Sequence, residues 1–360
     1  MKQYTDGYFL CVPCAGGCYS FYPEFFHPET AKRVYILRGG HSLCTDPLLS
    51  RIAEEAQLRH IQIEKIYSQR RPAMLEALAM PEKRVYLIDG NDPRTIHIKY
   101  PIAVETIVNT DLVFDHDNLK RNADAIRLLE KLTAAEQRRS MNYLSAVRSV
   151  SEDSFHLLSG GLNQDKIRRY AARFAAREFP SGKGKKSRAK NRFLSAVTRE
   201  GIWTNIQTLH TCKRVIAIDD SVGLAASALI YAIKQEAEER GLDCTVCRCQ
   251  THPAKKAEHI LIPEANIAFF TANRYHPAPE NTERTIHMTR FLDREQTANC
   301  RFRLNFNKKA IRELLEQTIK AEAEARELLD LTDAYYEAAL NEEKLSELLF
   351  HLRREVFTDC

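Results

Sequence analysis

The feature that most constrains this chain is an internal repeat. When Lys32 is aligned with Lys213, residues 32–59 match residues 213–240 without a gap, and nine of the 28 aligned residues are identical. The two segments are 181 positions apart. Further along the chain the match resumes at a separation of 182 positions, where Pro81-Glu82 aligns with Pro263-Glu264. Unrelated sequences would share only about one or two identities over such a stretch. The sequence therefore predicts a tandem duplication in which each repeat takes about half of the 360 residues.

Each repeat contains the same predicted order of elements. A strand–turn–strand comes first, then a compact apolar strand, an amphipathic helix and two further strands, and a long helical tail closes the repeat. This alternation is typical of α/β folds, so we expect two mainly parallel sheets flanked by helices, with each tail packed on its own sheet. The predicted segments are 8–11, 19–22, 33–37, 47–58, 60–67, 84–89 and 117–179 in the first repeat, and 193–197, 202–205, 214–218, 225–240, 244–249, 267–271 and 308–357 in the second.

The expected domains are residues 1–180 and 193–360, joined by a basic linker at 181–192. Residues 179–199 contain seven Lys and Arg side chains and no acidic one. Such a run can contact the phosphates of a nucleic acid. Its glycines and polar composition favour a solvated linker, which is our first interpretation.

Composition narrows the class of protein. With 44% hydrophobic and 28% charged residues, the chain is typical of a folded globular protein. No stretch has the ~18 uncharged apolar residues of a membrane helix. The first residues also lack the basic run that is typical of a signal peptide. We therefore expect a cytoplasmic location and no membrane partner. The net charge of +5 is too small to indicate a nucleic-acid partner by itself.

The ten cysteines include two clusters, at positions 11, 14 and 18 and at positions 244, 247 and 249. Neither cluster has the regular spacing of paired zinc ligands. Free cysteines in a reducing compartment are commonly buried. We therefore expect buried thiols and no metal site.

A glycine-rich turn between an apolar strand and a helix is where P-loop proteins bind phosphates. In the first repeat the frame G-x-x-x-x-G-K-[ST] falls on residues 39–46, where Gly39 and Gly40 open the loop. Asp46 places a carboxylate where an anion would dock, and with Pro47 it predicts an ordinary helix start, Asp46 as N-cap. Arg38, directly before the loop, is an alternative phosphate cation. The second glycine, the lysine and the magnesium-binding hydroxyl are replaced by Cys44, Thr45 and Asp46.

In the second repeat the same frame falls on residues 220–227. Gly223 and Ser227 are compatible with a nucleotide loop, but Asp220 replaces the first glycine and Ala226 replaces the lysine. Both repeats thus lack the lysine that neutralises a bound triphosphate. Ordinary ATP hydrolysis is not expected at either loop.

Asp89 ends the apolar segment 84–89 and is similar to a Walker B aspartate. A carboxylate at this place can hold Mg²⁺ through water. The second repeat has Thr271 at the corresponding position. Asp89 is the best single candidate for a catalytic residue, although a polar strand end explains it as well.

At these residues the sequence resembles the tandem P-loop ATPases, a family of bacterial proteins. The resemblance spans nearly the whole chain and includes the loop regions, Ile88-Asp89-Gly90, Ile262-Pro263-Glu264 and His276. It implies a duplicated nucleotide-binding fold with ATP and Mg²⁺ as possible cofactors. The positions that carry over from the family are Gly39, Asp89, Gly223, Ser227 and His276.

The sequence favours a degenerate tandem P-loop NTPase-like protein, a pseudo-ATPase that acts as a scaffold or regulatory module for an unidentified protein partner. The first alternative is an ATP-binding protein or ATPase whose phosphate cation comes from elsewhere. The second alternative is a nucleic-acid-associated protein that uses the basic linker.

Overall fold

The computed structural model describes residues 6–91, 96–181, 187–220 and 225–358. Its contacts divide the chain into two compact units, each built from two separate stretches. Unit 1 comprises the residues up to Phe21 together with Arg138–Ala321, and unit 2 comprises Tyr22–Gln137 together with the residues from Glu322 onward. Each unit therefore contains segments of both repeats.

Unit 2 contains the sheet of the first repeat, with strand order β4-β5-β6-β3-β7. The central strand β3 is parallel to β6 and β7, whereas β5 is antiparallel to β4 and β6. The sheet is thus mixed, because the antiparallel strand β5, which the sequence did not predict, is inserted between β4 and β6. The strands are β3 (Arg33–Arg38), β4 (Glu64–Tyr67), β5 (Leu75–Met80), β6 (Val85–Asp89) and β7 (Glu105–Asn109), and α1 (Ser42–Leu58) follows β3.

Unit 1 contains the sheet of the second repeat, with strand order β15-β11-β14-β13-β12-β8. Without the added edge strand β8, this order and these strand directions repeat those of the first sheet. Two hairpins, β1–β2 and β9–β10, belong to the same unit. The elements are β1 (Cys11–Cys14), β2 (Gly17–Ser20), β8 (Ala189–Arg192), β9 (Ser195–Thr198), β10 (Gly201–Thr204), β11 (Arg214–Asp219), α5 (Ala226–Glu239), β12 (Cys244–Arg248), β13 (Ala257–Ile262), β14 (Ile267–Ala272) and β15 (Thr282–His287).

Irregular features repeat as well. The register of β4 against β5 shifts after Ile66, and that of β12 against β13 shifts after Cys247. Cys247 is the residue that aligns with Ile66 when the register of Lys32 and Lys213 is continued along the chain. Arg84 and Asn266 each precede the next parallel strand with positive φ angles of 57° and 54°. Shared strand order, bulge position and backbone strain are the structural counterpart of the internal sequence repeat.

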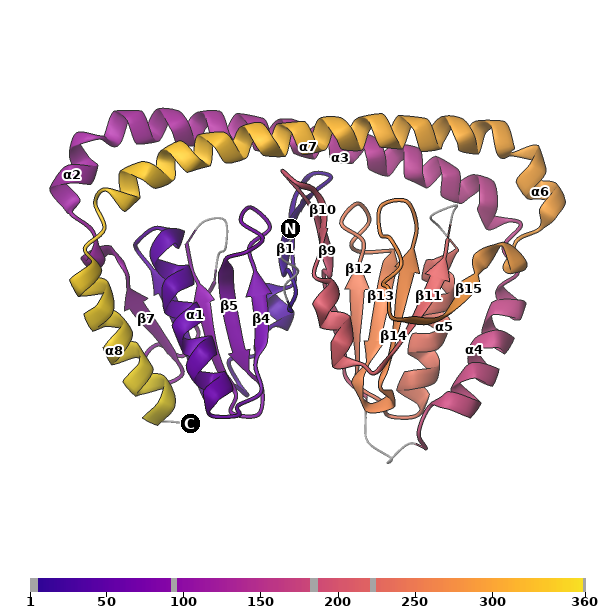
Figure 1. Cartoon of the computed structure of the whole chain (residues 1–360), viewed down its shortest axis with the longest axis horizontal. Helices are drawn as coiled ribbons and strands as arrows, with labels where there is room; N and C mark the ends of the chain where they lie inside the picture. Colours follow the sequence, from indigo (N-terminus) through magenta and orange to yellow (C-terminus); the bar gives the residue numbers. More distant parts are fainter. Residues whose placement is uncertain (1–5, 92–95, 182–186, 221–224, 359–360) are drawn as a thin grey trace. The chain divides into compact units, whose positions relative to one another are not determined.

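Each helical tail packs on the sheet of the other repeat. Phe174 of α4 is fully buried in one cluster with the apolar residues of α5 and the second sheet, and α4 lies along α5 (Figure 1). In unit 2, α8 contacts α1. The guanidinium carbon of Arg59, directly after α1, lies 4.4 Å from the ring centre of Phe357 in α8. The tail helices are α2 (His116–Arg121), α3 (Ala123–Ser159) and α4 (Gln164–Glu178), then α6 (Arg294–Asn299), α7 (Arg301–Glu337) and α8 (Glu342–Thr358).

The expectation that each tail would fold back on its own sheet was therefore wrong. The physical reason lies in α3 and α7, each of which is 37 residues long. A helix of that length rises ~55 Å, more than a small sheet can span, so a short hairpin cannot return the chain to its starting sheet.

Part of the predicted linker is structured. Residues Ala189–Arg192 form β8, which is parallel to β12, and the Arg192 side chain is buried. Residues 182–186 lie outside the described part. None of the helices in the described residues is both long and apolar enough to cross a membrane.

Candidate functional site

The backbone amides that open the first loop donate hydrogen bonds to protein side chains. The N–H of Gly39 donates to Asn91 Oδ1 at 3.1 Å, and the N–H of Gly40 donates to Thr110 Oγ1 at 2.9 Å. A Cβ atom on Gly40 would lie 2.7 Å from the carbonyl oxygen of Thr110, so close packing explains why glycine stands there. The exposed Arg38 precedes this turn. Amide donors that would contact a phosphate in a P-loop already have protein acceptors here.

The helix after this loop begins earlier than expected. α1 starts at Ser42, with the ring of His41 as the N-cap acceptor, so the expectation that Asp46 caps the helix was wrong. Thr45 and Asp46 lie in the second turn, and Thr45 is fully buried. Asp46 accepts hydrogen bonds from the Leu75 N–H at 2.7 Å and the Ser50 hydroxyl at 3.3 Å. Burial raises the pKa of Asp46.

The second loop shows a related arrangement in the residues that are described. Asp220 accepts a hydrogen bond from the Ala226 N–H at 2.8 Å, at the start of α5. Ser227 Oγ accepts a hydrogen bond from the Ala257 N–H at 3.1 Å, which ties α5 to β13. Gly223 lies outside the described residues.

Asp89 ends β6 as expected and is almost completely buried. Its Oδ1 accepts hydrogen bonds from the backbone N–H of Asn91 at 3.0 Å and from the Asn91 side-chain amide at 2.9 Å. The carboxylate therefore holds the turn after β6. The same Asn91 side chain accepts the Gly39 N–H, so Asp89 orders the first loop through Asn91.

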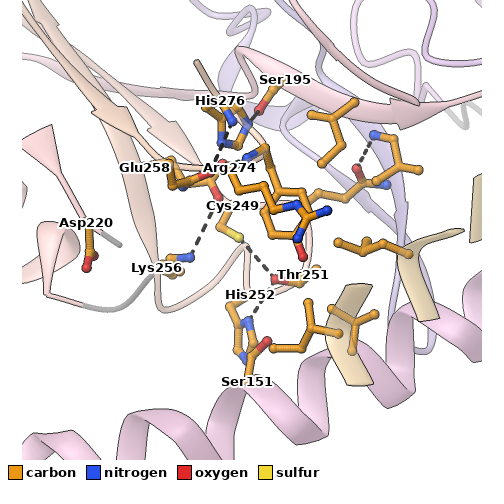
Figure 2. Close-up of a pocket in the computed structure, with 18 of the residues that line it drawn as sticks. Ser151, Ser195, Asp220, Cys249, Thr251, His252, Lys256, Glu258, Arg274 and His276 are labelled. Carbon is orange, nitrogen blue, oxygen red and sulfur yellow. Dashed lines mark hydrogen bonds and ion pairs between the residues drawn. The ribbon is translucent and has the colours of Figure 1, made fainter. Parts of the chain in front are cut away.

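A cavity of about 250 Å³ opens in unit 1 at the carboxyl ends of β11, β12 and β14 (Figure 2). In open α/β sheets this edge is the usual position of ligand sites. Helices α3 and α7 and the β9–β10 hairpin supply mostly apolar walls, whereas the sheet supplies charged groups. The apolar lining residues are Val147, Ala196, Val197, Ile202, Leu304, Ile311 and Leu315.

The charged part of the cavity centres on Lys256 and Glu258, whose Nζ and Oε1 atoms are 3.7 Å apart. Burial raises the pKa of Glu258, but the polar and charged side chains around it, including the Lys256 ammonium, outweigh that effect, so the pKa is lowered overall. Burial lowers the pKa of Lys256, but the nearby carboxylates of Glu258 and Asp220 contribute to a larger opposite effect, so the pKa is raised overall. Both groups are therefore charged at neutral pH.

Cys249, Thr251 and His252 form a chain along the same wall. Cys249 Sγ is 3.1 Å from Thr251 Oγ1, which is 3.0 Å from His252 Nδ1. Burial and then Glu258 raise the pKa of the Cys249 thiol to about 11, which keeps it protonated and poorly nucleophilic. The neighbouring Cys244 and Cys247 are also buried with raised pKa values, as expected, whereas the expectation of buried thiols was wrong for Cys18 of the other cluster, which is exposed.

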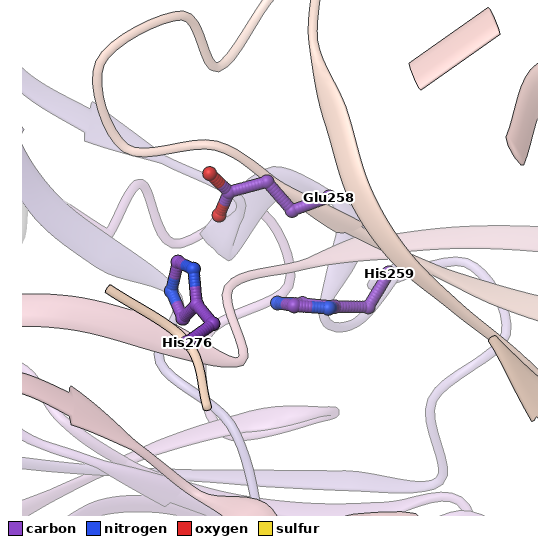
Figure 3. Close-up of side chains that lie close together, drawn as sticks. All are labelled: Glu258, His259 and His276. Atoms are coloured by element: carbon purple, nitrogen blue, oxygen red, sulfur yellow. The ribbon is translucent and has the colours of Figure 1, made fainter. Parts of the chain in front are cut away.

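His276 is the one sequence candidate that lines this cavity among the described residues. Its Nε2 is 3.0 Å from Ser195 Oγ, and the ring lies near Glu258 and His259 (Figure 3). Burial lowers the pKa of His276 and lowers the pKa of His259 to about 3, so both rings are neutral at pH 7. The candidates Arg38, Gly39, Gly40, Thr45, Asp46 and Asp89 belong to unit 2, whereas this group belongs to unit 1.

Glu258, His259 and His276 are the one group in the described residues with metal-ligand geometry, with donor atoms within 4.8 Å of one another. The fit fails at His259. The Thr271 N–H donates to its Nδ1 at 3.1 Å, so the neutral ring carries its proton on Nε2 and has no lone pair there for a metal. The Lys256 ammonium beside Glu258 also opposes a divalent cation.

Sequence reasoning missed Ser195, Lys256, Glu258 and His259 as site residues. Extending the register of Pro81 and Pro263 toward the N-terminus would have aligned Glu258 with Glu76 and marked this segment as a strand shared by both repeats. No protein-family model matches this chain, and no curated protein or solved structure is significantly similar to it.

Proposed function

We propose that the protein is a degenerate tandem P-loop NTPase-like protein that does not hydrolyse ATP and instead binds a small anionic, partly apolar molecule in the cavity of unit 1. The observation that carries this proposal is that backbone amides of both loops already donate hydrogen bonds within the protein. The N–H groups of Gly39, Gly40 and Ala226 donate to side-chain oxygens of the protein itself. Binding a triphosphate there would require breaking these bonds with no lysine to compensate.

The cavity suits a ligand with two chemically different ends. Its apolar walls can bury a short hydrocarbon chain, which stabilises binding by ~0.8 kcal/mol per buried CH₂. The exposed Arg274 and Lys308 also line it, and neither forms an ion pair with another described residue. A single carboxylate or phosphate group would be attracted to these two cations.

ATP binding is tested by thermal unfolding of the full chain in millimolar MgATP. We expect no change in Tm and no phosphate release. A ligand at ~100 times its Kd would add ~2.7 kcal/mol to the free energy of unfolding, so binding would raise the Tm by several degrees. A rise of that size with phosphate release would contradict the proposal, and its loss in Arg38→Ala would assign the missing cation to Arg38.

Ligand binding in the cavity is tested with octanoate, whose neutral counterpart 1-octanol is the matched probe. We expect octanoate to raise the Tm more than 1-octanol does. Arg274→Glu reverses an exposed lining charge and is expected to abolish the octanoate effect. Lys309→Glu makes the same charge change at an exposed residue outside the cavity, so it should leave the effect intact.

A second candidate function is binding of a nucleic-acid backbone at a neighbouring cavity of unit 1, which shares Leu304 and Lys308 with the first cavity. A shallow cavity of about 800 Å³ around α6 and α7 has five basic side chains and one carboxylate, Asp293. Asp293 Oδ1 already accepts the Gln296 N–H. The basic residues are Lys166, Arg290, Arg294, Arg301 and Lys308. Single-stranded oligonucleotides should bind with an affinity that falls steeply between 50 and 200 mM salt; no binding at low salt would exclude this candidate.

A further inference from the structure

Three polar side chains from separate segments meet on one wall of the cavity. Ser195 begins β9, Glu258 lies in β13, and His276 follows β14. All three are more than nine-tenths buried, and all three line the cavity. Ser195 Oγ and His276 Nε2 are 3.0 Å apart, which is hydrogen-bonding distance.

The His276 ring also lies close to a carboxylate (Figure 3). His276 Nδ1 is buried and has no hydrogen-bond partner in the described residues. A ring nitrogen of His276 and a carboxylate oxygen of Glu258 lie within 4.8 Å of each other (Figure 3). Because Nε2 faces Ser195, an ionised carboxylate near the ring favours a proton on the other nitrogen, Nδ1. His276 Nε2 is then left with the lone pair that accepts the Ser195 hydroxyl proton.

His259 supports this placement of the His276 proton. It also argues against a bound metal as the group that holds these side chains together. Its Nδ1 accepts the Thr271 N–H, so its Nε2–H adds a donor to the space around Glu258 and His276. A donor beside the carboxylate stabilises its charged form. The ring of His259 is also held in place by stacking on Phe270, with ring centres 4.4 Å apart.

We propose that Ser195, His276 and Glu258 act as nucleophile, general base and positioning carboxylate in the hydrolysis of a short-chain acyl ester bound in this cavity. This inference rests on the proposed ligand site. The apolar walls would bury the acyl chain, and Arg274 and Lys308 would attract an anionic alcohol portion of the ester.

The reaction needs only the ester and water. Ser195 Oγ attacks the carbonyl carbon, while His276 Nε2 takes the hydroxyl proton. The ester C–O bond then breaks, the proton passes from His276 to the departing alcohol oxygen, and the acyl group remains on Ser195. Water attacks this acyl-serine in the same way, which releases the carboxylic acid and returns the proton to Ser195. Glu258 orients the ring and stabilises the imidazolium that forms in each step.

The direct test is covalent labelling of the full-length protein with a fluorophosphonate probe, followed by peptide mapping by mass spectrometry. We expect the adduct on Ser195. Ser195→Ala should lose it, whereas Ser151→Ala, which removes another hydroxyl that lines the same cavity, should retain it. A folded wild-type protein that carries no adduct on Ser195 would overturn the proposal, whether or not any variant folds.

Hydrolysis of 4-nitrophenyl butyrate provides the second measurement. Glu258→Gln should lower kcat by ~10²-fold or more with little change in KM, because it removes the positioning charge and retains the side-chain shape. An unchanged kcat would show that Glu258 is only structural. If octanoate still raises the Tm while no adduct forms, the triad is wrong and the ligand site stands; if octanoate has no effect either, the ligand site is wrong as well.

Discussion

Each sheet has an edge at the carboxyl ends of its parallel strands. These two edges are equivalent in the internal repeat, but their side chains differ chemically. Glu76 and Glu258 occupy equivalent positions in the register that aligns Pro81 with Pro263, and both are buried. Glu76 accepts a hydrogen bond from the Tyr22 hydroxyl at 2.9 Å, which anchors it. Glu258 lies beside Lys256 and His276 and faces a cavity.

A second pair of equivalent residues shows the same divergence. Arg71 corresponds to His252 in the register that aligns Lys32 with Lys213. In unit 2 the Arg71 guanidinium pairs with Asp333 and donates to the Ser42 hydroxyl at 2.6 Å. In unit 1 the shorter His252 lines the cavity. One copy of the edge is therefore filled by a paired charge network, whereas the other contains a cavity.

The largest expected effect concerns that network. Asp333→Ala leaves the buried Arg71 guanidinium without its carboxylate, and breaking a buried ion pair in this way costs about 3–5 kcal/mol. Urea unfolding should therefore show a lowered midpoint. Asp330→Ala is the matched control, because Asp330 is an exposed carboxylate in the same helix that pairs with Arg326, and a surface pair contributes ~0–1 kcal/mol. Equal losses for the two variants would contradict the buried network.

The second prediction concerns acid. Burial lowers the pKa of His252 to about 4 and that of His259 to about 3, and it also lowers the pKa of His276, all in unit 1. Because an unfolded histidine titrates near 6.5, the unfolded state binds more protons below that pH. Each such histidine therefore removes up to ~1.4 kcal/mol of stability per pH unit between 6.5 and its folded pKa.

Unit 2 should respond less to the same change. Burial lowers the pKa of His41 to about 3, followed in effect by Arg71, but burial raises the pKa values of Asp46 and Asp333. A raised carboxyl pKa adds stability as pH falls, which opposes the effect of His41. Hydrogen exchange at pH 7.5 and 5.5, corrected for the intrinsic rate, should show protection lost first in β13 and β14. Equal loss in β5 and β6 would refute the difference between the units.

The repeat, the central strands and the first helix of each sheet could be predicted because their signals are local. The central strand β3 is one uninterrupted apolar run, and the identities between residues 32–59 and 213–240 carry its equivalence to β11. The strand β13 was missed because Glu258 and His259 interrupt its apolar pattern, although all six residues are buried. The edge strands β7 and β15 were missed because they contain few apolar residues, ETIVN and TERTIH, and show neither an apolar run nor a regular alternation.

The exchange of tails and the candidate site had no local signal. Nothing in the sequence of α4 distinguishes packing on one repeat from packing on the other, because both sheets offer similar apolar helices, α1 and α5. Ser195 and His276 are far apart in the sequence, and their contact depends on the path of β9 and on the turn after β14. The predictions about ATP, the pseudo-ATPase role and the protein partner stay predictions.

The smallest expected effect concerns the last position of the two degenerate loops, where Asp46 and Ser227 are equivalent. Each side chain accepts a hydrogen bond from the first residue of the antiparallel strand, Leu75 in β5 or Ala257 in β13. A position that would hold Mg²⁺ in a P-loop thus joins helix to strand in both repeats. Ser227→Ala leaves the buried Ala257 N–H without an acceptor, at a cost of about 1–3 kcal/mol. Ser227→Thr retains the hydroxyl and should cost less, as measured by urea unfolding; equal costs would show that the hydroxyl, and with it the shared contact, contributes nothing to stability.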